Sequence, residues 1–257
     1  MARRSPRPRS LRLQVVPAPY LTLSQVADVV ASERTGKGTL ISDCCQTGDY
    51  EEVFTSRAAA KRVARFRRRG LIGSAKTVVS TLTTLGPVGM SLLEVGGGAG
   101  EIQVTMLESG AAVNSTNVDL SQNWEAAALD LIAERGLTGR VTRITGDFVQ
   151  QANQLPKADA VVLHRVVCCY PDWEGMLTAA ASRANRFLVV TFPRSRPWFR
   201  AMIAVENFFN KLRRSTFRAF VHPPDAMIRL LAAKGLTAVA DEEDLVWRTI
   251  VTARTAG

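Results

Sequence analysis

A strand, a glycine-rich turn and the start of a helix follow one another from Leu92 to Leu107. The turn Glu94–Glu101 reads EVGGGAGE, with glycines at alternate positions after an acidic residue. Because side chains are absent at these positions, the backbone can approach a bound nucleotide closely. A dinucleotide-binding turn reads G-x-G-x-x-G and places a pyrophosphate at the N-terminus of the helix. Here Glu101 replaces the third glycine of that register, and its carboxylate would repel a pyrophosphate. The turn therefore disfavours a dinucleotide.

Acidic residues also follow the next two predicted strands. Asp119 ends the second strand, about 20 residues beyond the last glycine, and Asp147 follows Gly146 at the end of the third. In a mononucleotide-binding unit, an acid at the end of the second strand accepts hydrogen bonds from ribose hydroxyls. We therefore expect Asp119 to bind a ribose.

Taken together, these residues resemble class I S-adenosylmethionine (SAM) methyltransferases, whose motif I is similar to the E-x-G-x-G-x-G pattern. The resemblance implies SAM as the cofactor, with Glu94 facing the methionine ammonium directly or through water. It also implies that Asp147 accepts a hydrogen bond from the adenine amino group and that Phe148 lies against the ring. The implied cofactor-binding residues are Glu94, Gly96, Gly98, Gly100, Asp119, Leu120, Asp147 and Phe148.

Within that family, the chain is similar to bacterial small-molecule methyltransferases and, at a distance, resembles the magnesium-protoporphyrin O-methyltransferase group. The residues that carry this resemblance are Tyr170-Pro171-Asp172 and the segment 217–222, which reads FRAFVH. Cys169 stands where that group commonly has histidine. The resemblance therefore implies the broader class: methyl transfer to O, N or C of a hydrophobic small molecule. An anionic group on that molecule is an option that the basic residues of the chain suggest.

Methyl transfer needs an aligned nucleophile and, for some acceptors, a base that removes a proton. His164 closes the fourth predicted strand, His222 precedes the last helix, and Tyr50 lies in the segment expected to cover the cofactor. These three residues are the catalytic candidates, and a structural hydrogen-bonding role is the alternative for each histidine. The Asp/Asn-Pro-Pro-aromatic turn of methyltransferases that act on nucleobase amino groups is absent after the fourth strand.

The elements that must position these residues alternate as β and α from Ser91 onward. Apolar, β-branched strands alternate with helices, which predicts a parallel sheet covered on both faces. The last two strands are joined by a short acidic turn and must pair antiparallel. We predict an α/β, Rossmann-like, doubly wound sheet of seven strands, mostly parallel, with an antiparallel C-terminal hairpin strand and additional N-terminal helices. The expected segments are a disordered basic tail (1–21), a helical cap (22–86, with helices at 22–34, 56–69 and 73–85) and a SAM-binding domain (87–257).

An insert at 193–223 interrupts the domain. Trp198, Met202, Val205, Phe209 and Leu212 recur at helical spacing and form one apolar stripe. The stripe is interpreted as a helix packed on the core, as a substrate lid with a basic rim, or as a surface that rests on an anionic membrane.

The 257 residues include 33 basic and 23 acidic side chains, so the net charge is +10. Such a charge favours polyanions, anionic lipid surfaces or anionic small substrates, and two alternative functions follow from it. One is an RNA methyltransferase that binds phosphates through its arginine clusters, and the other is a non-catalytic basic binding module. No apolar run is long enough to cross a membrane.

The four cysteines form two adjacent pairs, Cys44-Cys45 and Cys168-Cys169, without Cys-x-x-Cys spacing. We therefore expect a reducing cytoplasm and no metal site, with a thiol or metalloid site as the alternative.

Overall fold

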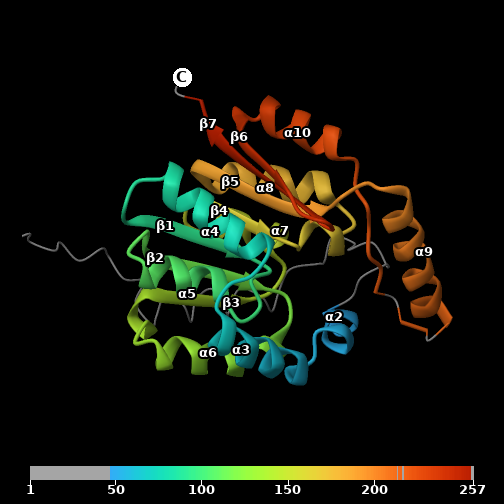
Figure 1. Cartoon of the computed structure of the whole chain (residues 1–257), viewed down its shortest axis with the longest axis horizontal. Helices are drawn as coiled ribbons and strands as arrows, with labels where there is room; N and C mark the ends of the chain where they lie inside the picture. The colour runs from blue at the N-terminus through green and yellow to red at the C-terminus, as the bar shows by residue number, and fades with distance from the viewer. Residues whose placement is uncertain (1–46, 213, 216, 256–257) are drawn as a thin grey trace, which may run out of the picture. The chain divides into compact units, whose positions relative to one another are not determined.

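The computed structural model describes residues 47–212, 214–215 and 217–255. The predicted tail, the predicted helix at 22–34 and the cysteine pair 44–45 lie outside these residues. Seven strands form one sheet, with the order β3-β2-β1-β4-β5-β7-β6 (Figure 1). Their bounds are Met90–Val95 (β1), Ala112–Asp119 (β2), Val141–Thr145 (β3), Ala158–His164 (β4), Ala184–Pro193 (β5), Leu236–Glu243 (β6) and Trp247–Arg254 (β7).

The first five strands pair in parallel, and β7 pairs antiparallel with both β5 and β6. The predicted fold class is therefore confirmed, including the antiparallel strand of the C-terminal hairpin. The order changes direction between β1 and β4, which are neighbours in the sheet although β2 and β3 lie between them in sequence. Ligands of doubly wound sheets bind beyond the carboxyl ends of the strands at this switch point.

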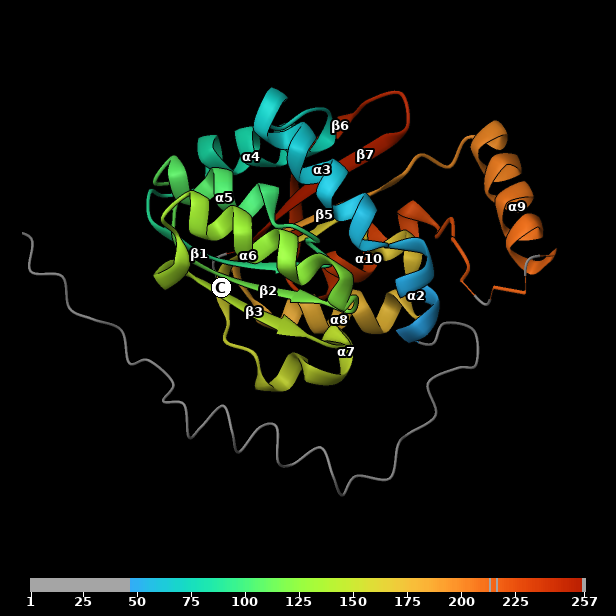
Figure 2. The same ribbon diagram turned by 90° about the horizontal axis from the view of Figure 1, so that it is seen from below.

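Helices cover both faces of the sheet (Figure 2). One face is covered by α3 (Ser56–Arg69), α4 (Ser74–Leu85), α5 (Glu101–Glu108) and α6 (Glu125–Glu134). The other face is covered by α7 (Phe148–Gln151), α8 (Trp173–Arg183) and α10 (Pro224–Ala233). Two further helices are α2 (Thr47–Val53), which precedes α3, and α9 (Pro197–Leu212). No helix in these ranges is long and apolar enough to cross a membrane.

Alternating strand residues divide the core into two halves. Leu92 and Val162 face a cluster that includes buried residues of α3 to α6, whereas Leu93 and Val161 face one that includes buried residues of α7, α8 and α10. Because helices cover both faces, the central strands carry consecutive apolar residues, such as Leu92-Leu93 in β1 and Val161-Val162 in β4. Helices α3 and α4 share the first half of the core with the sheet, so the predicted cap residues in these helices pack as part of the domain.

The structure contains one helix in the cap that was not predicted. Helix α2 begins at Thr47, between the helices expected at 22–34 and 56–69. Tyr50 of α2 is buried, with its ring 5.6 Å from that of Phe217 in an edge-to-face arrangement. The contact joins residues far apart in the sequence, so tertiary packing supports a helix that local propensity does not predict.

Candidate active site

A cavity lies at the carboxyl ends of β1, β2, β3 and β4, with walls from α2 and α3. Its lining includes residues that follow each of these strands, together with a ring of aromatic side chains and two arginines. The aromatic residues that line it are Tyr50, Phe54, Trp124, Phe148 and Tyr170, and the arginines are Arg62 and Arg165. The cavity therefore has an apolar wall and a basic wall.

The glycine turn forms the floor of this cavity with its backbone. Gly96 has φ +63°, and a Cβ at this position would lie 2.5 Å from Val166, so only glycine fits. Gly98 also lines the cavity, and its N–H donates to Asp119 Oδ2 at 2.7 Å. Gly100 does not line the cavity but precedes α5 in a left-handed conformation. Two of the three predicted glycines therefore face the site, and the third shapes the turn.

Asp119 and Leu120 line the cavity where β2 ends. The second oxygen of Asp119, Oδ1, accepts the N–H of Ser121 at 3.0 Å. Burial raises the pKa of Asp119, while the hydrogen bonds from Ser121 and Gly98 act in the opposite direction. Each carboxylate oxygen can accept a further hydrogen bond, so the group can still bind hydroxyls from the cavity.

Asp147 and Phe148 line the cavity where β3 ends. Asp147 Oδ1 caps α7 by accepting the N–H of Val149 at 2.7 Å, and Oδ2 accepts the hydroxyl of Tyr170 at 3.0 Å. The structure thus brings together the acids after β2 and β3, as the parallel topology requires.

Glu94 does not line the cavity. Its side chain is buried beneath the glycine turn, and Oε2 accepts from the N–H of Gln103 and from Nδ2 of Asn117, both at 3.4 Å. Burial and the nearby Glu101 raise the pKa of Glu94 to about 8. The raised pKa favours the neutral form of this buried carboxyl group.

His164 lines the cavity, but the hydrogen bond of its Nε2 atom is already made. Nε2 lies 3.0 Å from Ser74 Oγ, which also accepts from Nε of Arg165 at 3.1 Å and from Nη2 at 2.8 Å. Because two guanidinium hydrogens occupy the lone pairs of Oγ, the hydroxyl hydrogen is directed at Nε2. Burial, together with Arg165 and Arg62, lowers the pKa of His164 to about 3. The geometry therefore disfavours His164 as a general base.

The other two catalytic candidates also make structural contacts. Nε2 of His222 donates to the carbonyls of Val167 and Tyr170 at 3.1 and 3.0 Å, and the residue does not line the cavity. Tyr50 does line the cavity, and its hydroxyl donates to the carbonyl of Cys169. Both residues thereby fasten the segment after β4.

Sequence reasoning did not single out the two cavity arginines. Arg62 of α3 donates to Glu101, and its guanidinium lies 5.6 Å from the ring centre of Trp124. Arg165 has φ +60°, a conformation that is uncommon outside glycine and that often marks functional sites. The signals available were the arginine cluster at 57–69 and the position of Arg165 directly after a strand end.

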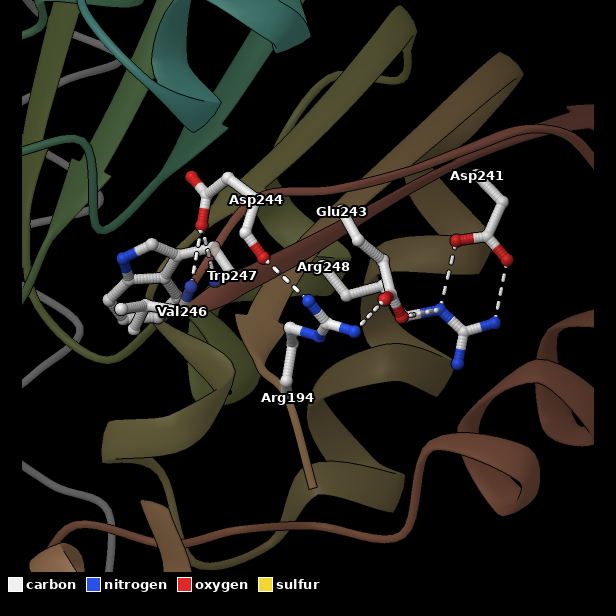
Figure 3. Close-up of polar contacts among 7 residues, drawn as sticks. All are labelled: Arg194, Asp241, Glu243, Asp244, Val246, Trp247 and Arg248. Atoms are coloured by element: carbon white, nitrogen blue, oxygen red, sulfur yellow. Dashed lines mark hydrogen bonds and ion pairs between the residues drawn. The ribbon is translucent and has the colours of Figure 1, made fainter. Parts of the chain in front are cut away.

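The C-terminal hairpin holds an aromatic ring against Arg165. The guanidinium lies 4.3 Å from the ring centre of Trp247, the first residue of β7. Asp244 accepts the N–H groups of Val246 and Trp247 at 2.8 and 2.7 Å, which closes the turn before this ring (Figure 3). Ion pairs from Arg194 to Glu243 and from Arg248 to Asp241, at 2.5 and 2.6 Å, brace the same hairpin.

Comparison with known families decides the class to which this site belongs. Residues 27–178 match the family of O-methyltransferase domains. The chain belongs to this family. Its members use SAM as the methyl donor, which confirms the expected cofactor and the expected enzyme class. Among the three functions considered from the sequence, the family supports a small-molecule methyltransferase.

Solved structures show the same fold. Magnesium protoporphyrin IX methyltransferase from Synechocystis PCC 6803, with bound S-adenosylhomocysteine (SAH), is 19% identical with a TM-score of 0.61, covering 80% of this chain and 100% of its own. An O-methyltransferase family protein from Burkholderia thailandensis is 18% identical with a TM-score of 0.61, covering 80% of this chain and 63% of its own. An O-methyltransferase family 2 protein from Planctomyces limnophilus, in complex with apigenin, is 17% identical with a TM-score of 0.55, covering 77% of this chain and 62% of its own.

No curated protein matches the chain significantly. In the part of the chain that the structure describes, no three His, Cys, Asp or Glu side chains form a group that could hold a metal ion. Cys169 lines the cavity and its Sγ lies 3.8 Å from that of Cys168. The alternative of a thiol or metalloid site requires both cysteine pairs, and Cys44 and Cys45 lie outside the described residues.

Proposed function

We propose that this protein transfers a methyl group from SAM to an oxygen atom of a hydrophobic small molecule that binds as an anion. The observation that carries the proposal is the composition of one cavity, which joins the acids after β2 and β3 to an aromatic wall and to two arginines. The family supports oxygen as the acceptor atom, and the arginines support the negative charge.

The residues present are a good fit for SAM. Gly96 and Gly98 expose backbone to the cavity, Asp119 can accept hydrogen bonds from ribose hydroxyls, and Asp147 with Phe148 offers an acceptor and a ring for adenine. When bound, SAM supplies an electrophilic methyl group attached to a sulfonium. We assign Glu94 to the support of the glycine turn and not to direct contact with the cofactor.

The acceptor oxygen would be oriented by the basic wall. Arg165 is held by Ser74 and Trp247, and Arg62 is held by Glu101, so both guanidinium groups are fixed before a ligand arrives. A carboxylate bound there is already deprotonated at neutral pH and needs no general base. A phenol, whose pKa is about 10, must first lose its proton to solvent, and the two guanidinium groups would favour this ionisation. The absence of a general base is consistent with His164, whose Nε2 is already hydrogen-bonded to Ser74. The enzyme would then contribute the alignment of the acceptor with the methyl group and the exclusion of water.

A methyl-transfer screen tests the proposal. The full chain is incubated with methyl-labelled SAM and a panel of lipophilic carboxylic acids and phenols, with their amides and methyl ethers as matched neutral controls. We expect transfer to one or more acids or phenols and none to the neutral controls. Transfer to neutral amines or to RNA alone would contradict the proposal.

A further inference from the structure

Helix α9 carries an apolar face that the rest of the described chain does not cover. Its exposed apolar side chains retain between 47% and 70% of their accessible surface, whereas Phe199 is the only buried residue of the helix. The exposed residues are Trp198, Met202, Val205, Phe208, Phe209 and Leu212. Figures 1 and 2 show α9 apart from the helices that cover the sheet. The stripe is exposed and therefore does not pack on the core, and no residue of α9 lines the cavity.

The opposite face of α9 is anchored. Phe199 is buried, and the side chain of Asn207 makes two hydrogen bonds to the backbone of Ala219, at 2.8 and 2.9 Å. At 3.6 residues per turn these two positions lie on one side of the helix, away from the exposed stripe. The helix is thus held with its apolar face outward.

Basic side chains lie along one edge and at both ends of the exposed face. At 3.6 residues per turn, Arg200 and Lys211 lie at the Phe208 edge, whereas Glu206 lies at the Met202 edge. Arg196 and Arg214 lie just outside the two ends of the helix. Arg196, Arg200, Lys211 and Arg214 are exposed, and none of them forms an ion pair with a carboxylate of the described residues. Glu206 is the only acidic residue between Arg194 and Pro223 in the sequence. An aromatic-rich apolar face with unpaired arginine and lysine along one edge and at its ends is typical of helices that lie in the interface of an anionic membrane.

We propose that α9 docks the protein on the surface of an anionic lipid bilayer. The apolar side chains would enter the boundary between headgroups and acyl chains, and the flanking cations would contact lipid phosphates. Charge favours this occupant over a second copy of the chain, because a two-fold contact between α9 helices would bring the same basic flanks together.

Docking would also affect the cavity. Asn207 is hydrogen-bonded to Ala219, and Phe217 lies two residues before Ala219 in the same segment. The ring of Phe217 packs against Tyr50 and Phe54 in the cavity wall. A docked α9 would therefore hold this wall close to the bilayer. The effect on the cavity rests on the proposed function, whereas the docking of α9 on a bilayer is independent of it.

Vesicle co-sedimentation of the full chain tests the proposal. The probes are phosphatidylcholine vesicles and vesicles that also contain about 30% phosphatidylglycerol, each at about 0.1 M and about 1 M salt. We expect binding to the anionic vesicles that falls at high salt, and little binding to the neutral ones. Absence of binding to the anionic vesicles at low salt would overturn the proposal.

Two pairs of variants locate the surface. Phe208→Ser/Leu212→Ser should weaken vesicle binding about tenfold or more, whereas Val88→Ser/Leu129→Ser, which also alters two exposed apolar residues, should bind like the wild type. Arg200→Gln/Lys211→Gln should reduce binding more than Arg68→Gln/Arg69→Gln on α3. Wild-type binding by both α9 variants would refute the assignment to α9.

Two further measurements separate the alternatives. All variants should keep the wild-type affinity for SAH, so a loss of vesicle binding is distinguished from unfolding and from failure of the proposed function. Sedimentation velocity detects self-association. A dimer that Phe208→Ser/Leu212→Ser dissociates, without any vesicle binding by the wild type, would show that a second copy covers this face and would overturn the proposal.

Discussion

Nε2 of His164 lies 3.0 Å from Oγ of Ser74. The same hydroxyl oxygen accepts two N–H groups of the Arg165 guanidinium. The contact joins the end of β4 to the start of α4. The Ser74 hydroxyl therefore contacts the predicted base, His164, and orients its neighbour Arg165 at the same time.

The pH dependence of activity should therefore lack a histidine inflection. Because the pKa of His164 is lowered to about 3, the side chain is neutral throughout the usual assay range. We expect the profile of kcat/KM against pH to follow the ionisation of the acceptor, and His164→Gln to keep the same profile shape. A wild-type inflection near 6.5 that disappears in His164→Gln would assign proton removal to this residue.

The same lowered pKa affects stability. The unfolded chain binds a proton at His164 near pH 6.5, whereas the folded chain does not until about pH 3. The free energy of unfolding should therefore fall as pH decreases from about 6.5 toward 3. Denaturant unfolding of the wild type and of His164→Gln should show a shallower decrease in the variant. Parallel curves would contradict the assignment.

Glu94→Gln should stabilise the protein without a large loss of cofactor affinity. The folded-state pKa of about 8 exceeds the reference value of 4.5, so ionisation costs stability as pH rises through this interval. The amide removes this cost, and we expect a gain of roughly 1–3 kcal/mol at pH 8 and little gain at pH 4. SAH affinity should change less than about threefold, since Glu94 does not line the cavity. A loss of a hundredfold or more would instead support a direct role in binding.

Asp119→Ala should weaken SAM and SAH binding at least about tenfold, because the carboxylate both accepts from ligand hydroxyls and holds the Gly98 N–H. Asp130→Ala, at an exposed position on α6, is the matched control and should bind normally. Calorimetric titration measures both variants. Unchanged affinity in a folded Asp119→Ala protein would refute the ribose assignment.

Arg165→Gln should raise KM for an anionic acceptor with a smaller effect on SAH affinity. The ion pair between the Arg165 guanidinium and the anionic acceptor would be partly buried, so its loss should raise KM about tenfold or more. Arg229→Gln, at an exposed position on α10, should leave KM unchanged. An equal loss for a charged acceptor and for its neutral analogue would show that Arg165 supports the fold and not the recognition of charge.

The sequence predicted the sheet well because apolar strands and strand-end acids have few structural solutions. Asp119 and Asp147 meet at one edge since parallel strands end there together. The periodicity of β1 does not say whether the side chain of Glu94 lies above or below the following turn, and the structure buries it beneath the turn. The partnership of His164 with Ser74 spans 90 positions and leaves no local pattern. The stripe of α9 predicted a helix correctly, but periodicity alone cannot distinguish a covered face from an exposed one.

Calorimetric titration of the full chain with SAH tests the central claim most directly. A cavity built from Asp119, Asp147 and the glycine turn should bind SAH with a 1:1 stoichiometry and a Kd of about 1–100 µM. Saturable binding in this range, weakened in Asp119→Ala and unchanged in Asp130→Ala, is the result that we predict. No saturable heat up to about 1 mM SAH would contradict the assignment of this cavity as a cofactor site.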